Sequence, residues 1–338
     1  MKRSACWFSI LAVVILFVIS AMTVHAAPPL KVSDFGDLQA AIDAAREGDT
    51  IVVDVDTPGA LVNKRLIIRG VDGKGAGGLI SGTRLGPKYH AASTGLVLSS
   101  TASGTELTNL RIEAAVGIAS DHVVHDVIPA DDITVRGCTI TASDFGFYLV
   151  NIGFLENGSS WNIEHNIIDI RNPIQLFDAS WAVALSRQWE NMRIAHNKIS
   201  AVMIWDNVGS VAIYGGVVVL GGADVEVVQN DISVNMMDNP DHPWADPVLF
   251  MGTPSISNVT VAMNDLRGSL TARGPFGVTY VGFLDDDSDR TGLEAFDHIP
   301  ASGDVPGTFS VGGNLSSGLG NRGGLSTIDL GIYNLLNP

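Results

Sequence analysis

The chain has 338 residues, of which 46% are hydrophobic and 17% charged, and its 36 acidic and 20 basic residues give a formal net charge of −16. This combination excludes a disordered chain, and 2 cysteines are too few for a disulfide-stapled scaffold. An acidic chain repels phosphate backbones, so the composition also argues against nucleic acid as a partner.

Residues 1–26 have the pattern of a secretory signal peptide. Basic residues precede an apolar run from Ile10 to Ile19, and small residues around Ala26 supply a cleavage site. The alternative is a membrane anchor, but the run is short for a span, which needs about 20 residues. We therefore expect cleavage after Ala26 and a secreted or periplasmic location. The mature chain, residues 27–338, is expected to form one domain with no membrane span.

A short helix is predicted near the start of the mature chain. Between Asp37 and Ala45 the apolar residues fall at helical spacing, and Gly48 supplies a stop. The first strand is then expected from Thr50 to Val53. A helix at this place would cover the open end of a stacked fold, where exposed strands otherwise recruit other chains.

One phrase recurs through the rest of the chain: apolar, any, apolar, any, any, Asn, any, apolar. Full copies carry Asn166, Asn197, Asn230 and Asn264, and looser copies have Leu110 and Cys138 in the Asn place. We call this place the ladder position, and it returns every 28 to 34 residues. A sustained period of this length predicts a solenoid of stacked repeats.

Each copy contains two short strands of alternating polarity around a corner, then a loop and a third apolar strand. Alternation at period two buries one face of each strand. No copy contains an amphipathic helix that would serve as a crossover, which disfavours a βαβ sheet. We expect each copy to pair its strands in parallel with the next. The repeated Asn is expected to adopt the left-handed αL conformation at the corner and to form an internal ladder.

Three stretches carry a resemblance to a known family: Leu38 to Val53, Leu66 to Gly70 and Leu79 to Gly82. With the Asn-bearing copies, they resemble right-handed parallel β-helix proteins of the pectate-lyase-like superfamily, which share the pectin lyase fold. The resemblance implies an all-β fold, a right-handed parallel β-helix (solenoid) with a short N-terminal capping helix. It implies no single reaction, because the superfamily includes polysaccharide lyases, glycoside hydrolases, esterases, epimerases and proteins without known chemistry.

The catalytic motifs of the superfamily are absent. Asp131-Asp132 matches only the paired acid of polygalacturonase-like hydrolases, and an acidic pair before a strand is typical of a solvated corner. Arg171-Asn172-Pro173 matches only part of the R-x-P-x-x-R stretch of pectate lyases. The motifs therefore leave open whether the chain is a lyase, a hydrolase or no enzyme.

Topology indicates where a site is expected. In the superfamily the substrate groove usually lies along one sheet and the long loop that leads into it, which directs attention to the loops before each third strand. The candidate catalytic residues in these loops are Asp178, Arg187, Asp206 and Asp246, with Asp144 in the corresponding place of an earlier copy. Carboxylates that converge there would serve acid–base hydrolysis or hold Ca²⁺ for a lyase. Solvated loop carboxylates are the alternative.

Tryptophans are a second indication, because only 7% of the residues are aromatic. Trp189, Trp205 and Trp244 are candidate substrate-binding platforms for the apolar face of a sugar ring, and core packing is the alternative for each. Trp161 has an inward position in the repeat and is expected in the core.

The metal content stays open. His165 and His196 occupy the same place in consecutive copies and are expected to stack, either as a metal pair or, as we favour, as ordinary corner histidines. The run Asp285 to Asp289 has the carboxylate spacing of a Ca²⁺ loop, but Arg290 stands where such a loop has Gly. Ca²⁺ is the one cofactor that the sequence suggests.

Together these features predict a secreted β-helix protein that binds an extracellular polysaccharide. A stronger form of the hypothesis has it cleave the polysaccharide as a lyase or a glycoside hydrolase. The alternative is a non-catalytic surface or periplasmic β-helix with an adhesive or structural role. Carboxylates that converge in a groove would favour an enzyme, and carboxylates dispersed over different faces would favour the alternative.

Overall fold

The structure is a computed structural model of the chain. It describes residues 28–71, 77–83, 93–120, 129–149, 158–171, 179–185, 189–204, 213–219, 222–237, 245–251, 256–268, 278–280, 308–312, 314–317, 326–328 and 332–334. The expected signal peptide lies outside these residues. No helix within them is long and apolar enough to cross a membrane. The helical segments are η1 (Val32–Asp34), α2 (Leu38–Ala44) and η2 (Ser100–Ala102).

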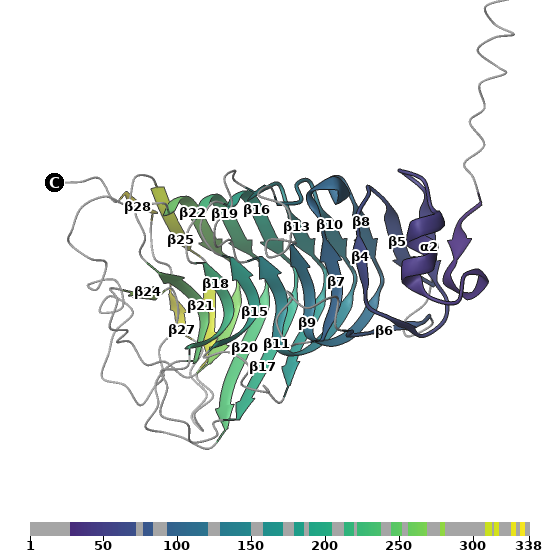
Figure 1. The fold of residues 1–338 in the computed structure, drawn as a ribbon. Coiled ribbons are helices and arrows are strands. Elements are labelled where there is room, and N and C mark those ends of the chain that lie inside the picture. Colours follow the sequence, from purple (N-terminus) through teal and green to yellow (C-terminus); the bar gives the residue numbers. More distant parts are fainter. Residues whose placement is uncertain are drawn as a thin grey trace, which may run out of the picture.

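One face of the fold is a sheet of 12 strands, which we call sheet A. Its strands in spatial order are β1 (Leu30–Lys31), β2 (Thr50–Val53), β5 (Ile67–Gly70), β8 (Glu106–Thr108), β10 (Thr134–Arg136), β13 (Asn162–Glu164), β16 (Trp189–Ala195), β19 (Gly222–Val228), β22 (Ile256–Ala262), β25 (Thr308–Gly312) and β28 (Ile332–Asn334), and β12 (Gly158–Ser159) pairs with β16. Strand β28 is antiparallel to β25, and the other pairs are parallel. Figure 1 shows these strands side by side along an elongated stack, with α2 at one end.

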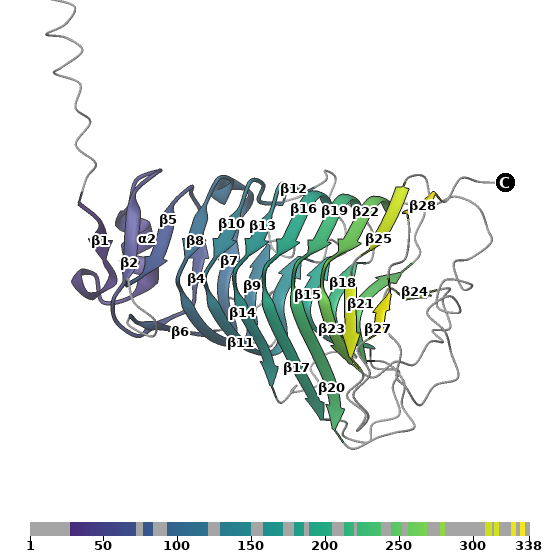
Figure 2. The ribbon, with the colours of Figure 1, turned by 180° about the vertical axis from the view of Figure 1, so that it is seen from behind.

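A second sheet of 16 strands, sheet B, forms two further faces. Its strands are β3 (Thr57–Pro58), β4 (Ala60–Val62), β6 (Leu79–Ser81), β7 (Thr94–Leu98), β9 (Arg111–Ser120), β11 (Thr139–Leu149), β14 (Ile167–Arg171), β15 (Ala179–Leu185), β17 (Lys198–Ile204), β18 (Ile213–Val219), β20 (Asp231–Met237), β21 (Ala245–Met251), β23 (Asp265–Gly268), β24 (Val278–Tyr280), β26 (Asn314–Ser317) and β27 (Ser326–Ile328). The first half of β11 pairs with β14 and its second half with β15. The long strands β9 and β11 therefore run across both faces, which Figure 2 shows from behind.

The sheets are built coil on coil. Strands β13, β14 and β15 follow one another in the chain, and each pairs in parallel with its counterpart in the next coil, β16, β17 and β18. Parallel pairing between successive copies is the defining feature of a β-solenoid. The predicted all-β parallel β-helix is therefore confirmed.

The predicted capping helix is also confirmed. Asp37 is the N-cap of α2, where its Oδ1 accepts a hydrogen bond from the Ala40 N–H at 2.7 Å. Helix α2 contacts β2 and β4 and turns Leu38, Ala41 and Ile42 into the core. The helix thus covers the apolar interior at this end of the stack.

The core is a continuous apolar row through successive coils. The residues two places after the ladder position are at most 1% exposed: Ile112, Ile140, Ile168, Ile199 and Ile232. They are register partners across β9, β11, β14, β17 and β20. Each coil therefore buries its apolar face against its neighbours, which is the main favourable term in the folding free energy.

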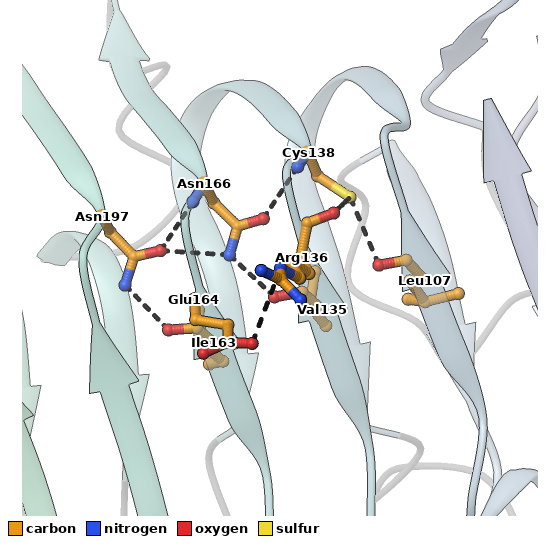
Figure 3. A network of polar contacts seen from close by, with 8 residues as sticks. All are labelled: Leu107, Val135, Arg136, Cys138, Ile163, Glu164, Asn166 and Asn197. Atoms are coloured by element: carbon orange, nitrogen blue, oxygen red, sulfur yellow. Dashed lines mark hydrogen bonds and ion pairs between the residues drawn. The ribbon is translucent and has the colours of Figure 1, made fainter. Parts of the chain in front are cut away.

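The ladder position joins the coils by hydrogen bonds inside the corner (Figure 3). The Oδ1 atom of Asn197 accepts from the Asn166 backbone N–H at 2.9 Å and from the Asn166 Nδ2 at 3.1 Å, and the Asn197 Nδ2 donates to the Ile163 carbonyl at 2.8 Å. Asn230 and Asn264 repeat this pattern. These Asn side chains are at most 2% exposed. The predicted internal ladder is confirmed.

Cys138 occupies the ladder position one coil before Asn166. Its backbone N–H donates to the Asn166 Oδ1 at 2.9 Å, and its Sγ accepts from the Leu110 N–H at 3.4 Å (Figure 3 draws the first contact). The Sγ lies 3.6 Å from the Leu107 carbonyl oxygen, in the place that an amide nitrogen takes in the later coils. Burial raises the pKa of the Cys138 thiol to about 12. A protonated thiol therefore continues the ladder with weaker hydrogen bonds.

The αL residue of the corner was predicted one position too late. The φ angle is positive at His165 (57°), His196 (56°), Gln229 (57°) and Met263 (56°), each of which directly precedes a ladder Asn. The His165 and His196 side chains are exposed, and the Asn that follows each is buried. The corner turns at the residue before the Asn, which leaves the amide free to reach the neighbouring coils from inside.

Candidate functional site

A groove opens on sheet B where β9 and β11 pass from one face to the other. It has a volume of about 570 Å³, and we call it the bend groove. Its lining consists of Ser81, Gly82, Ser93, Glu113, Ala114, Ala115, Thr141, Ala142, Ser143 and Arg171. The volume falls within the range of ligand pockets, roughly 300 to 1,000 Å³.

A β-bulge and small side chains form the groove. The register between β9 and β11 shifts after Ala142, so that two residues of β11 stand opposite one residue of β9. Bulges bend a strand and re-aim its side chains. A Cβ atom at Gly82 would lie 2.6 Å from the Ala114 Cβ and 2.8 Å from the Ser93 Oγ, so only glycine fits there. Glycine at this position therefore lets the chain after β6 approach β9 closely at one side of the groove.

A polar row crosses the floor of the groove from coil to coil. Ser81 pairs in register with Glu113, Glu113 with Thr141, and Thr141 with Asp169 of the next strand. Neighbouring strands lie about 4.8 Å apart, so these side chains emerge at regular spacing. In each of these strands the preceding residue points into the core, and the row faces outward by alternation. The row aligns polar groups along the stack of coils.

Arg171 and Asp169 form an ion pair at one side of the groove. The guanidinium of Arg171 donates to the Asp169 Oδ2, and the Ser200 Oγ, on β17, donates to the Asp169 Oδ1 at 2.8 Å. The Arg171 side chain is 66% exposed and that of Asp169 only 13%. The hydrogen bond from Arg171 to Asp169 raises the pKa of Arg171. Asp169 thus holds the guanidinium in place and offsets its charge.

Glu113 is the second charged residue of the lining. Its side chain is exposed, and within the described part of the chain it has no hydrogen bond or ion pair. Ser143, on β11, donates from its Oγ to the Asp144 Oδ2 at 3.1 Å, and Asp144 is fully buried. The groove therefore combines an open carboxylate, a paired guanidinium and several hydroxyls.

Most of the predicted site residues lie outside the described residues: Asp178, Arg187, Asp206, Trp205 and Trp244. Asp246 lies in β21, where its register partner is Gly215 of β18, and that row continues through Trp181 to Phe145. Asp144 is one position out of this row and is buried. The register therefore does not align Asp144 with Asp246.

The interpretation of Trp189 as a sugar platform is wrong, because its side chain is 0% exposed. Its ring lies edge-to-face against Trp161, with centroids 5.9 Å apart and an interplanar angle of 84°. Trp161 is buried as predicted, and its Nε1 donates to the Ala130 carbonyl at 2.7 Å. Both tryptophans therefore belong to the core, where edge-to-face pairs are favourable.

The two corner histidines stack as predicted. The rings of His165 and His196 are parallel within 3°, with centroids 4.7 Å apart. Across the described ranges, no group of three or more His, Cys, Asp or Glu side chains is placed to hold a metal ion. The Asp285 to Asp289 run lies outside those ranges. Asp131 is a corner residue whose Oδ1 accepts from the Ser159 N–H at 2.7 Å.

Glu113, Asp169 and Arg171 are not among the predicted site residues. The repeat nevertheless carries a signal that finds the first two, since both stand three places after the ladder position. In the coils whose burial the structure describes, the residue two places after it is inward, so the third place is outward. Polar residues at that place mark the outer row of sheet B.

Comparisons with known proteins add little. No protein-family model matches the sequence, and no curated protein matches it. The solved structures with some likeness include the crystal structure of an alginate lyase from Paenibacillus sp. str. FPU-7, at 14% sequence identity and a TM-score of 0.38, over 70% of this chain and 93% of that one. A likeness at this level carries no conclusion about the substrate of this chain.

Proposed function

We propose that this chain is exported through its N-terminal signal and binds an extracellular polysaccharide along the bend groove. The observation that carries the proposal is the groove itself, an open channel of about 570 Å³ built by consecutive coils and lined by hydroxyls and charged groups. The signal-peptide pattern of residues 1–26 supports a secreted or periplasmic location.

The lining chemistry fits a sugar chain. Ser81, Ser93 and Thr141 each carry a hydroxyl group, which can donate and accept as sugar hydroxyls do, and the Oγ of Ser143, which donates to Asp144, can still accept. Arg171 supplies fixed donors, and Glu113 supplies an acceptor. The small floor around Ala142 leaves room for a ring. Register pairing repeats such groups at about 4.8 Å from coil to coil, which suits a ligand that is itself a repeating chain.

Binding is better supported than hydrolysis by the groove carboxylates. Glu113 and Asp169 lie two strands apart in register, with Thr141 between them. Glycosidases need two carboxyl groups about 5 to 9.5 Å apart that are both free to react. Both oxygens of Asp169 are already engaged by Arg171 and Ser200. The groove therefore offers one available carboxylate.

The residues predicted from the sequence remain the proposed catalytic set: Asp178, Arg187, Asp206 and Asp246, of which Asp246 lies in β21. Trp205 and Trp244 remain the proposed platforms for sugar rings, and Ca²⁺ remains the proposed metal for a lyase reaction. Cleavage produces new reducing ends in either reaction, and a lyase also produces an ultraviolet-absorbing double bond. Alanine substitution of each of these three acids, with product formation followed with and without chelator, tests this part separately from binding.

A matched pair of substitutions tests binding. Thr141→Leu removes a groove hydroxyl and adds bulk at the centre of the floor, whereas Thr134→Leu makes the same change on the outer face of sheet A. Titration calorimetry against a panel of neutral and acidic polysaccharides should show binding by the full chain. We expect Thr141→Leu to weaken it by about fivefold, as for a lost hydrogen bond of about 1 kcal/mol. Thr134→Leu should leave it unchanged.

Two results would contradict the proposal. If the folded protein binds no member of the panel, the groove has another role, and the adhesive or structural alternative gains support. If Thr134→Leu and Thr141→Leu weaken binding equally, the polysaccharide does not occupy the bend groove.

A further inference from the structure

The charges around the bend groove do not favour a polyanion. Arg171 is the one cation of the described lining, and Asp169 offsets it through their ion pair. Glu113 adds a carboxylate that has no partner among the described residues. Arg111 lies on the same strand as Glu113, but it is outside the lining and its guanidinium donates to the Gly77 carbonyl. A carboxylate-bearing ligand therefore meets no uncompensated cation in the described lining.

An uncharged polysaccharide meets no such obstacle. Its hydroxyls can exchange hydrogen bonds with Ser81 and Thr141 in the lining and can donate to the Oγ of Ser143. The guanidinium of Arg171 keeps free N–H donors while Asp169 holds it, since an arginine carries five. The formal charge of −16 for the whole chain adds a weak repulsion of polyanions, which salt screens beyond about 8 Å.

Asp169 controls the charge of the groove through its two oxygens. The Oδ2 accepts a hydrogen bond from the Arg171 guanidinium, and the Oδ1 accepts one from the Ser200 hydroxyl at 2.8 Å. An amide at this position would keep an oxygen for Ser200 but no negative charge for Arg171. The side chain of Asp169 is 13% exposed and that of its ion-pair partner Arg171 is 66% exposed, so Asp169 acts on a ligand through Arg171.

We propose that the bend groove selects an uncharged polysaccharide and that Asp169 is the residue that sets this selectivity. The inference rests on the proposed function, because it names the class of polysaccharide that the same groove takes. Asp169 keeps Arg171 as a hydrogen-bond donor and prevents it from acting as an anion receptor.

The test is Asp169→Asn in the full chain, with a neutral glucan and alginate as the two probes. Calorimetry of the unsubstituted protein should give tighter binding of the glucan than of alginate. In Asp169→Asn the affinity for alginate should rise by about fourfold or more at low salt, the Coulomb effect of one released charge about 5 Å from a carboxylate in water. The gain should shrink as salt is added. Glucan binding should change much less.

Two further variants show whether the released guanidinium is the cause. Glu164→Gln is the matched control, because Glu164 pairs with Arg136 at 3.7 Å on the outer face of sheet A, away from the groove. It removes the same charge and should leave the ratio of the two affinities unchanged. The double variant Asp169→Asn with Arg171→Gln should lose the gain for alginate. Circular dichroism should confirm that each variant is folded.

The outcomes separate this inference from the proposed function. If the unsubstituted protein binds alginate more tightly than the glucan, or if Glu164→Gln raises alginate binding as much as Asp169→Asn does, the selectivity proposal is overturned and polysaccharide binding stands. If neither probe nor any other polysaccharide binds, the proposed function itself fails. If Asp169→Asn does not fold, Arg171→Gln alone decides, because it should lower glucan binding without favouring alginate, and a rise in alginate binding overturns the proposal.

Discussion

Asn197→Ala breaks the internal ladder at its centre. The Asn197 amide joins the coils on both sides. Its Oδ1 accepts hydrogen bonds from Asn166, and its Nδ2 donates to the Ile163 carbonyl and to the Asn230 Oδ1. The side chain is 2% exposed, so water cannot replace these partners without opening the corner. We expect a folded but markedly less stable protein.

The size of the effect follows from the groups that lose a partner. The Asn166 backbone N–H loses its acceptor at 2.9 Å, and the Ile163 carbonyl loses its donor at 2.8 Å. Asn230 is less affected, because its Oδ1 still accepts from the backbone N–H of residue 197 at 2.9 Å. Each buried polar group left without a partner costs about 1 to 3 kcal/mol. The unfolding free energy should therefore fall by about 2 to 6 kcal/mol.

Urea unfolding followed by circular dichroism measures this loss, with Lys198→Ala as the control. Lys198 is the next residue and is exposed, so its substitution should change the unfolding free energy by no more than about 0.5 kcal/mol. A loss below about 1 kcal/mol for Asn197→Ala, or an equal loss for both variants, would refute the assignment of the ladder as a main link between coils.

Three further predictions concern the core. Burial raises the pKa of the Cys138 thiol to about 12, so this thiol should react with a thiol reagent only after unfolding. Because the unfolded thiol ionises near pH 8.5, the unfolding free energy should fall by about 1.4 kcal/mol per pH unit as the pH rises from there toward 12. The variant Cys138→Ser should lack this pH dependence. Trp189→Phe should lower the melting temperature and leave polysaccharide affinity unchanged, because Trp189 packs in the core. A loss of binding without a loss of stability would show instead that Trp189 binds the ligand. Gly158→Ala should lower the unfolding free energy by about 1 to 3 kcal/mol, since its Cβ would lie 2.3 Å from the Trp189 ring. An unchanged melting temperature in this variant would contradict the packing.

Local pattern was sufficient for the coil and its ladder. Alternation at period two identified the inward isoleucines, such as Ile140 and Ile168, and the period of 28 to 34 residues identified the stacking. The spacing also placed Asn166 and Asn197 in consecutive coils. These features repeat because every coil packs against its neighbours in the same way, so the pattern of one copy predicts the structure of the others.

The local sequence pattern did not predict the burial of Trp189, because the alternation is interrupted in β16. Met192 and Ile194 are inward, so strict alternation along β16 would turn Trp189 outward. Asn191 has a φ of 53°, and this αL residue shifts the alternation so that Trp189 is buried. The sequence shows an Asn before Met192 but does not show that it breaks the strand.

The sequence by itself determined the repeat, the apolar interior, the ladder and the helical cap, because each depends on residues close in the chain or on the period. Only the tertiary structure decided the bend groove. Ser81 and Arg171 lie on β6 and β14, and they line one groove because parallel register and a bulge in β11 bring their coils together. Register depends on which strands pair over long separations, and the charge of Arg171 depends on where Asp169 points; neither is a local property of the chain.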